Sequence, residues 1–367
     1  MVYSFFIALL VSCGPKKQTV TAQVFAEFPP FAEVPVQHQK RWLDTRFSSS
    51  TTQEQKEIWT MLLDEQFVTF RQDAIAILIA DTKNSTIATA LLGNPSAPIF
   101  ERCFVGIQSL LNKIDLKTDF IPSQTPTPND KLYCSLLYSM QRENFDTFFR
   151  VFQQQELPLE RTFYQLLTKI PFPKSELATN MKEKLLGEED DFGFLSLYTT
   201  WFLLDRDAVQ SSLIDHLLGA DEDDRLEVLE ILWGNPKGMP IFDALANTEK
   251  YSGIFANLAK TASGYEDVSF ALTYLQEGKT WELRLVALEA LGMWYGKNPR
   301  HKKSKQVHKE LTNLIETEYT DVLISLLKGL QSSQLTDAIE PIQKLNPIDP
   351  LAKIERVVAL RKLSTQK

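Results

Sequence analysis

Apolar residues recur along most of this chain at intervals of three and four positions, which is the spacing of one face of an α-helix. One example is the segment 98–111, in which Phe100, Phe104 and Ile107 form an apolar stripe. No segment alternates convincingly between apolar and polar residues over about six positions, as a half-buried strand does. The pattern predicts an all-α fold.

The predicted helices follow one another at short intervals from residue 51 to residue 363. The clearest interruption is the segment 120–130, where Pro122, Pro126 and Pro128 indicate a loop and a candidate internal boundary. After this loop, helices are predicted at residues 130–141, 144–155, 159–169, 174–186, 192–204, 207–219, 223–233, 238–247, 250–261, 266–276, 280–295, 304–317, 320–331, 335–345 and 349–363.

One helical unit recurs in the second half of the chain. Its clearest copy runs from Trp281 to Gly292 and combines an arginine, an alanine three positions later and a closing Glu-Ala-Leu-Gly. The recurring positions are Arg225, Arg284, Ala287, Leu291, Arg356, Ala359 and Leu363. Small alanines allow close approach of helices, leucines fill the space between helical pairs, and each arginine can bond loop carbonyls or a carboxylate.

This unit resembles the second helix of a HEAT repeat. The resemblance implies an α-solenoid of HEAT-like helical pairs over residues 201–367, in which successive pairs stack and create an extended binding surface. No matching unit is found before residue 200. The region 51–200 is therefore expected to be either a helical bundle or a set of diverged repeats.

The N-terminus carries a short apolar run that ends in Leu10-Val11-Ser12-Cys13. This tetrapeptide resembles the lipobox of bacterial lipoproteins. The resemblance implies that residues 1–12 are a signal peptide and that Cys13 is lipidated, so that it becomes the first residue of a membrane-anchored protein. Because a signal peptide opens with positive charge and Met1–Ser4 has none, we expect the signal peptide to start upstream of Met1. The alternative is a buried N-terminal helix with an incidental cysteine.

The residues after Cys13 refine this expectation. In Gram-negative lipoproteins, an aspartate directly after the lipidated cysteine retains the protein in the inner membrane. Gly14 therefore implies an outer-membrane lipoprotein that faces the periplasm. The segment 13–50 contains several prolines and is predicted to be an extended tether, whose apolar residues we expect to dock on the folded body.

Composition agrees with a helical globular protein and narrows its partners. The chain is 44% hydrophobic and 23% charged, a balance that allows a sizeable core. Its 14 glycines in 367 residues are few, which favours helices over glycine-rich turns. The net charge of −8 argues against a nucleic-acid partner, because proteins that bind nucleic acids usually carry a basic surface.

Two cysteines, Cys103 and Cys134, remain if Cys13 carries lipid. Both lie in predicted helices, so in an oxidising compartment they can form a disulfide between neighbouring helices. The alternative is that both are buried thiols, which pack as small hydrophobic side chains.

The common catalytic and metal-binding motifs HExxH, paired CxxC and GxSxG do not occur in the sequence. We therefore predict no catalytic residue, metal site or cofactor. This favours a non-enzymatic, membrane-anchored scaffold that binds protein partners through a helical-repeat surface, by analogy with other repeat proteins. The alternative is an envelope polysaccharide lyase or glycosidase on an α/α toroid, which would need two carboxylates about 5–10 Å apart in a cleft.

Overall fold

The computed structural model describes residues 34–35, 38–39, 41–42, 75–76, 79, 88–89, 92–93, 97–114, 127–155, 161–186, 194–248, 250–275, 280–315, 319–333 and 335–365. Within these ranges every regular element is a helix, which confirms the all-α prediction for this part of the chain. The chain forms two compact units. Unit 1 comprises residues 1–42 and 232–367, and unit 2 comprises residues 43–231.

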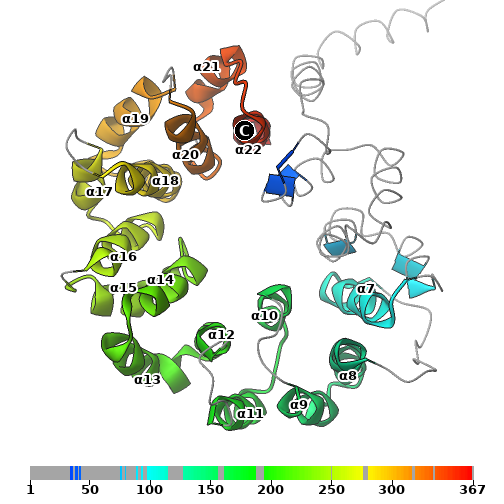
Figure 1. Cartoon of the computed structure of the whole chain (residues 1–367). Coiled ribbons are helices and arrows are strands. Elements are labelled where there is room, and N and C mark those ends of the chain that lie inside the picture. The colour runs from blue at the N-terminus through cyan, green and yellow to red at the C-terminus, as the bar shows by residue number, and fades with distance from the viewer. Residues whose placement is uncertain are drawn as a thin grey trace, which may run out of the picture. The chain divides into compact units, whose positions relative to one another are not determined.

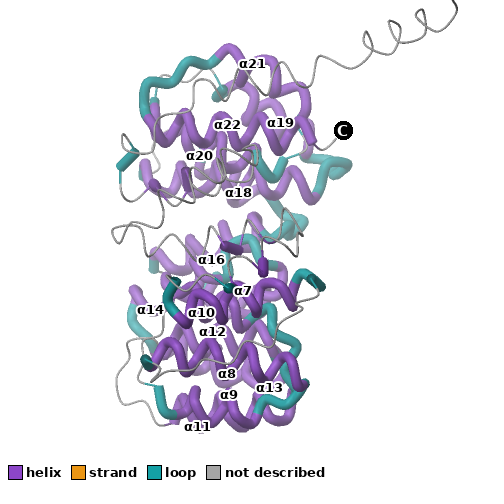
Figure 2. Tube along the Cα trace, turned by 90° about the vertical axis from the view of Figure 1, so that its right-hand side faces the viewer, coloured by secondary structure: helices purple, strands orange, loops and turns teal. Residues whose placement is uncertain are grey.

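Unit 2 is a succession of helices that pack on their neighbours in the chain. Contacts link α7 to α8, α8 to α9, α9 to α11 and α11 to α12, and α12 also contacts α10, α13 and α14. Figure 2 shows α8, α9 and α11 one below the other. The helices are α7 (Ile99–Leu111), α8 (Pro128–Arg142), α9 (Asp146–Gln153), α10 (Arg161–Leu167), α11 (Lys174–Leu186), α12 (Phe194–Leu204), α13 (Arg206–Gly219) and α14 (Glu222–Ile231).

The pairing of α7 with α8 is fixed by polar and covalent contacts. Asp130 and Thr127 form a capping box at the start of α8, and Asp130 Oδ1 also accepts a hydrogen bond of 2.7 Å from the Phe100 amide at the start of α7. Cys103 in α7 and Cys134 in α8 form a disulfide, with Cα atoms 5.0 Å apart. Of the two alternatives for these cysteines, the structure contains the disulfide.

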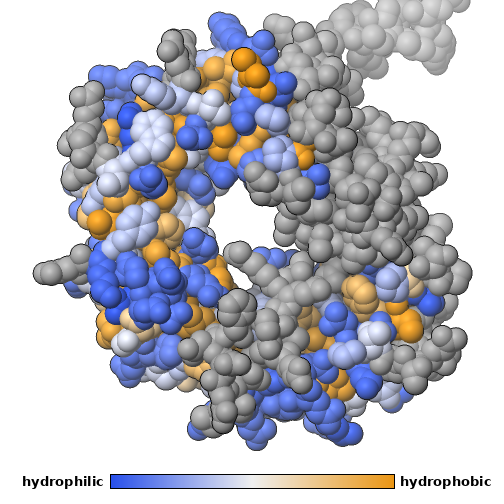
Figure 3. Space-filling model, viewed as in Figure 1, coloured by the Kyte–Doolittle hydropathy of each residue, from blue (hydrophilic) through white to orange (hydrophobic). Residues whose placement is uncertain are grey.

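Unit 1 contains two sets of helices. Helices α16, α18, α20 and α22 pack on one another in succession, whereas α17 and α19 contact α18 and α21 contacts α22 (Figure 1). The helices are α15 (Met239–Leu245), α16 (Tyr251–Ala262), α17 (Ser269–Tyr274), α18 (Trp281–Lys297), α19 (Ser304–Asn313), α20 (Thr320–Leu330), α21 (Ile339–Lys344) and α22 (Pro350–Thr365), with 3-10 turns η3 (Pro236–Gly238) and η4 (Thr336–Ala338). On the face drawn in Figure 3, hydrophilic and hydrophobic residues are interspersed over these helices.

Helices α18 and α20 approach each other closely at a point where two glycines face each other. A Cβ placed on Gly292 would lie 2.3 Å from the backbone carbon of Gly329. The sequence analysis assigned close approach to small residues such as Ala287, which is fully buried. The structure adds a close contact between Gly292 and Gly329, where neither helix carries a side chain.

Six of the seven recurring positions are either fully buried or bonded to the end of a neighbouring helix. Ala287, Leu291, Ala359 and Leu363 are fully buried. Arg225 donates hydrogen bonds of 2.8 and 2.9 Å to the carbonyls of Leu217 and Leu218, at the end of α13. Arg356 donates hydrogen bonds of 3.0 and 2.6 Å to the carbonyls of Ile342 and Gln343, at the end of α21. These arginines therefore join consecutive helices by satisfying carbonyls that a helix end leaves open.

Arg284 is the exception. Its Nε is buried without a hydrogen-bond partner among the described residues, and its guanidinium lies 5.9 Å from the centre of the Trp281 ring. The segment 276–279, which follows α17, lies outside the described residues.

The boundary between the units differs from the predicted division between 51–200 and 201–367. The structure divides after Ile231, because α13 and α14 pack on α12 and so belong with unit 2. The Arg225 copy of the repeat pattern therefore lies in a different unit from the copies that contain Arg284 and Arg356.

Candidate functional site

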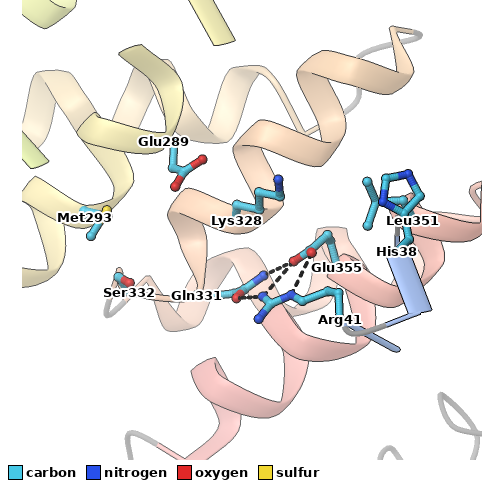
Figure 4. Close-up of a pocket in the computed structure, with 9 residues that line it drawn as sticks. All are labelled: His38, Arg41, Glu289, Met293, Lys328, Gln331, Ser332, Leu351 and Glu355. Atoms are coloured by element: carbon cyan, nitrogen blue, oxygen red, sulfur yellow. Dashed lines mark hydrogen bonds and ion pairs between the residues drawn. The ribbon is translucent and has the colours of Figure 1, made fainter. Parts of the chain in front are cut away.

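A charged cavity lies in unit 1 where α18, α20 and α22 meet the N-terminal segment 34–42. Its volume is about 450 Å³. The residues that line it are His38, Arg41, Glu289, Met293, Lys328, Gln331, Ser332, Leu351 and Glu355 (Figure 4). The helices are held in place by the buried leucines and alanines of the repeat pattern, so the polar residues of the cavity stand on a rigid support.

Two of the residues that line the cavity form an ion pair, although they come from opposite ends of the chain. Arg41 Nε donates to Glu355 Oε1 over 2.8 Å, and Arg41 Nη2 donates to Glu355 Oε2 over 3.0 Å. This two-point geometry matches the planar guanidinium to the planar carboxylate. The Glu355 side chain is completely buried, whereas that of Arg41 is 35% exposed.

Gln331, which ends α20, completes this network. Its carbonyl oxygen accepts a hydrogen bond from Arg41 Nη2, and its amide donates to Glu355 Oε2. Both carboxylate oxygens of Glu355 are therefore occupied by donors. A buried carboxylate is tolerated only when it is paired and hydrogen-bonded in this way, so the N-terminal segment is a structural part of unit 1.

Two apolar side chains near Arg41 in the sequence are buried as well. Val34 and Trp42 are only 3% and 6% exposed. Residues 38–39 and 41–42 of the region 13–50 are helical, and Arg41 binds Glu355 in unit 1.

Glu289, on α18, is the second carboxyl group of the cavity. Its Oε1 accepts a hydrogen bond of 3.2 Å from Trp233 Nε1. Burial raises the pKa of the Glu289 carboxyl above its ordinary value, and the nearby Lys328 ammonium and the Trp233 hydrogen bond oppose this rise only in part. Glu289 therefore holds a proton more strongly than an exposed glutamate does.

Lys328, on α20, is the cation of the cavity that the Arg41 network does not include. Its ammonium makes no ion pair or hydrogen bond with the described residues, although it is close enough to Glu289 to influence its pKa. Figure 4 shows Lys328 and Glu289 on adjacent helices, beside the Arg41–Glu355 pair. Met293 and Leu351 form the apolar part of the cavity wall, and His38 and Ser332 are the remaining lining residues.

The sequence analysis did not select the residues of this cavity. None of the recurring positions lines it, and Cys103 and Cys134 lie in unit 2. Cys13 lies outside the described residues. A signal was nevertheless present. When the segment 320–331 is aligned with the Trp281–Gly292 unit, Leu323 takes the place of Arg284 and Lys328 takes the place of Glu289. The repeat frame thus places both polar residues at one equivalent position, on the same side of adjacent helices.

Within the described ranges, no group of three or more His, Cys, Asp or Glu side chains could hold a metal ion. None of the helices described is both long enough and apolar enough to cross a bilayer.

Comparison with known proteins adds no relationship to this geometry. No family model, no curated protein and no solved structure matches the chain.

Proposed function

We propose that this chain is a lipid-anchored protein of the bacterial cell envelope that binds protein partners through unit 1. The observation that carries the proposal is the packing of α16, α18, α20 and α22 in succession, with a charged cavity on α18, α20 and α22. Successive helices of this kind offer a continuous surface to a partner. No cofactor is required.

The finer architecture that we propose for unit 1 is an α-solenoid of HEAT-like helical pairs. Its support is Arg356, which bonds the last carbonyls of the preceding helix α21 in unit 1, as Arg225 does for α13 in unit 2. The Gly292–Gly329 contact adds support, because close parallel stacking of equivalent helices is typical of repeat arrays.

The envelope location that we propose rests on two independent features. The first is the lipobox-like tetrapeptide that ends at Cys13, followed by Gly14, which favours an outer-membrane anchor that faces the periplasm. The second is the disulfide between Cys103 and Cys134. Disulfides persist in the oxidising periplasm and are rare in the bacterial cytosol.

Affinity capture with a matched pair of variants tests partner binding. The full chain is captured from membranes as wild type, as Lys328→Glu and as Lys309→Glu, and the bound proteins are quantified by mass spectrometry. Lys309 is an exposed residue of α19 outside the cavity. We expect one or more partners to be lost from Lys328→Glu alone. A set of bound proteins that is identical for all three chains contradicts the proposal.

A glycan-cleaving enzyme is the second candidate, because Glu289 and Glu355 share one cavity and the pKa of Glu289 is raised. Such an enzyme needs a protonated acid and a second carboxylate that is free to act. The Arg41 and Gln331 donors occupy both oxygens of Glu355, which favours the binding function. Release of soluble sugar from envelope glycans by the wild type, abolished in Glu289→Gln, would establish the enzyme instead.

A further inference from the structure

The cavity contains an ammonium group, that of Lys328, and a carboxyl group, that of Glu289, outside the Arg41 network. Arg41, Gln331 and Glu355 are bonded to one another. Lys328 makes no ion pair or hydrogen bond with the described residues. Glu289 uses Oε1 to accept from Trp233, and its Oε2 accepts no hydrogen bond from the described residues. A ligand in the cavity can therefore reach both groups without breaking the Arg41 network.

We propose that the cavity binds the C-terminal carboxylate of a partner peptide that ends in an apolar residue. The Lys328 ammonium pairs with the carboxylate, Glu289 Oε2 shares a proton with it, and Met293 and Leu351 contact the terminal side chain. This inference rests on the proposed function, because it names the part of the partner that unit 1 recognises.

The charges of the cavity favour a carboxylate over other ligands. Arg41 and Glu355 neutralise each other, so Lys328 is the cation available to an anion, and a single negative charge suits it. A dianion such as phosphate would also face Glu289 and Glu355. An amide or hydroxyl ligand would leave the ammonium without a counter-ion in a partly buried position, which is unfavourable.

The volume and the walls favour a chain end over an internal acidic residue. About 450 Å³ exceeds what a carboxylate alone requires and is enough for a terminal residue with its side chain. Met293 on α18 and Leu351 on α22 are half-buried apolar side chains with part of their surface facing the cavity. An apolar terminal side chain would cover them, whereas a charged one would not.

Proton sharing makes this binding depend on pH in a defined direction. Below the raised pKa of Glu289 its carboxyl group is neutral and donates a hydrogen bond to the ligand carboxylate. Above this pKa, the ionised Glu289 carboxylate repels the ligand carboxylate, and Lys328 is the cation of the cavity that offsets this repulsion. The groups that act on Glu289 are Lys328 from α20, Glu355 from α22, Arg41 from the N-terminal segment and the Trp233 N–H. Affinity should therefore fall as the pH rises, with proton uptake on binding.

Calorimetric titration of the purified full chain with two matched probes tests the inference. The probes are N-acetyl-Ala-Ala-Leu with a free C-terminal carboxylate and the same peptide with a C-terminal amide. We expect the amide to bind at least about tenfold more weakly. Lys328→Met should weaken the binding of the free-acid peptide by about the same factor. Lys309→Met should leave the affinity for this peptide unchanged. Equal affinity for the acid and the amide, or equal affinity of the two lysine variants for the acid, overturns the inference.

Peptide titrations of single variants at several pH values separate the contribution of Glu289 from that of His38, which also lines the cavity. Glu289→Gln should retain binding of the free-acid peptide and lose most of its pH dependence. His38→Gln should retain the pH dependence of the wild type. The reverse result, with the pH dependence lost only in His38→Gln, overturns the role given to Glu289.

The peptide titrations and the capture experiment can fail separately. If the peptides do not bind but Lys328→Glu still loses a partner from membranes, the proposed function stands and the carboxylate inference is wrong. If the peptides bind as expected but all captured proteins are the same, the cavity recognises carboxylates and the partner-binding function is wrong.

Discussion

Glu355 shows how single residues join distant parts of this chain. It is completely buried on α22, and the charge that neutralises it comes from Arg41, which is 314 positions away in the sequence. Removal of one partner from a buried ion pair leaves the other charge without compensation, and this destabilises a fold more than the pair itself stabilises it. The Arg41 contact should therefore be measurable as stability of unit 1.

Arg41→Met should lower the free energy of unfolding by about 2–3 kcal/mol, below the usual cost for a buried pair because water reaches the arginine. The double variant Arg41→Met with Glu355→Gln should recover part of this loss, since the glutamine is neutral. Urea denaturation measures both. Lys344→Met is the control, because it removes an exposed pair with Glu340 in the same unit. An equal loss in Arg41→Met and Lys344→Met would mean that the Arg41 contact is not structural.

Glu289→Gln should stabilise unit 1, and by an increasing amount as the pH rises. The raised pKa of Glu289 means that the folded state binds the proton more tightly than the unfolded state, whose ordinary value is 4.5. The stability contributed by this proton is present at low pH and is lost as the pH rises through the folded pKa. The free energy of unfolding of the wild type and of Glu289→Gln, measured at a series of pH values, isolates the effect. A difference in stability between the two proteins that does not change with pH would contradict it.

At the scale of the helix, the stacking of α18 on α20 depends on the absence of side chains. Gly292→Ala should destabilise unit 1 by about 2 kcal/mol, because its Cβ would meet the Gly329 backbone, which cannot move aside as a flexible side chain can. Gly219→Ala in α13 is the matched control, because a Cβ there meets nothing within 4 Å. It should be neutral or slightly stabilising. Calorimetry of both variants measures the effect, and equal behaviour would contradict the close packing.

The helices could be predicted from the sequence because their signal is local. The predicted segments 174–186 and 304–317 and the observed α11 and α19 begin at the same residues, and most other ends agree within a few positions. The apolar period and the residues at helix ends carry this information.

The unit boundary and the cavity could not be predicted in the same way. α14 carries the repeat arginine Arg225, yet it packs on α12 in unit 2. The spacing of apolar residues predicts a helix but does not indicate which neighbouring helix it packs against. The pairing of Arg41 with Glu355 has no local signature, since either residue alone resembles an ordinary surface charge. The equivalence of Glu289 and Lys328 in the repeat frame was the one available indication of the cavity.

For the molecule as a whole, the disulfide in unit 2 relates the fold to a cellular compartment. Cys103→Ala with Cys134→Ala should lower the free energy of unfolding of unit 2 by about 3–4 kcal/mol, because the bond closes a loop of 31 residues in the unfolded chain. Alkylation of the natively expressed protein should modify neither cysteine until a reductant is added. Free alkylation of both without reductant would contradict the disulfide and remove its support for an oxidising compartment.

The proposed lipid anchor would set the compartment, the orientation and the kind of partner available, so the proposed function depends on it most directly. Metabolic labelling with a fatty-acid probe, followed by separation of membrane and soluble fractions, tests it for the wild type and Cys13→Ser. We predict that the wild type carries the label and stays with the membrane, whereas Cys13→Ser carries none and is released. Label that persists on Cys13→Ser, or a wild type without label, would contradict the claim.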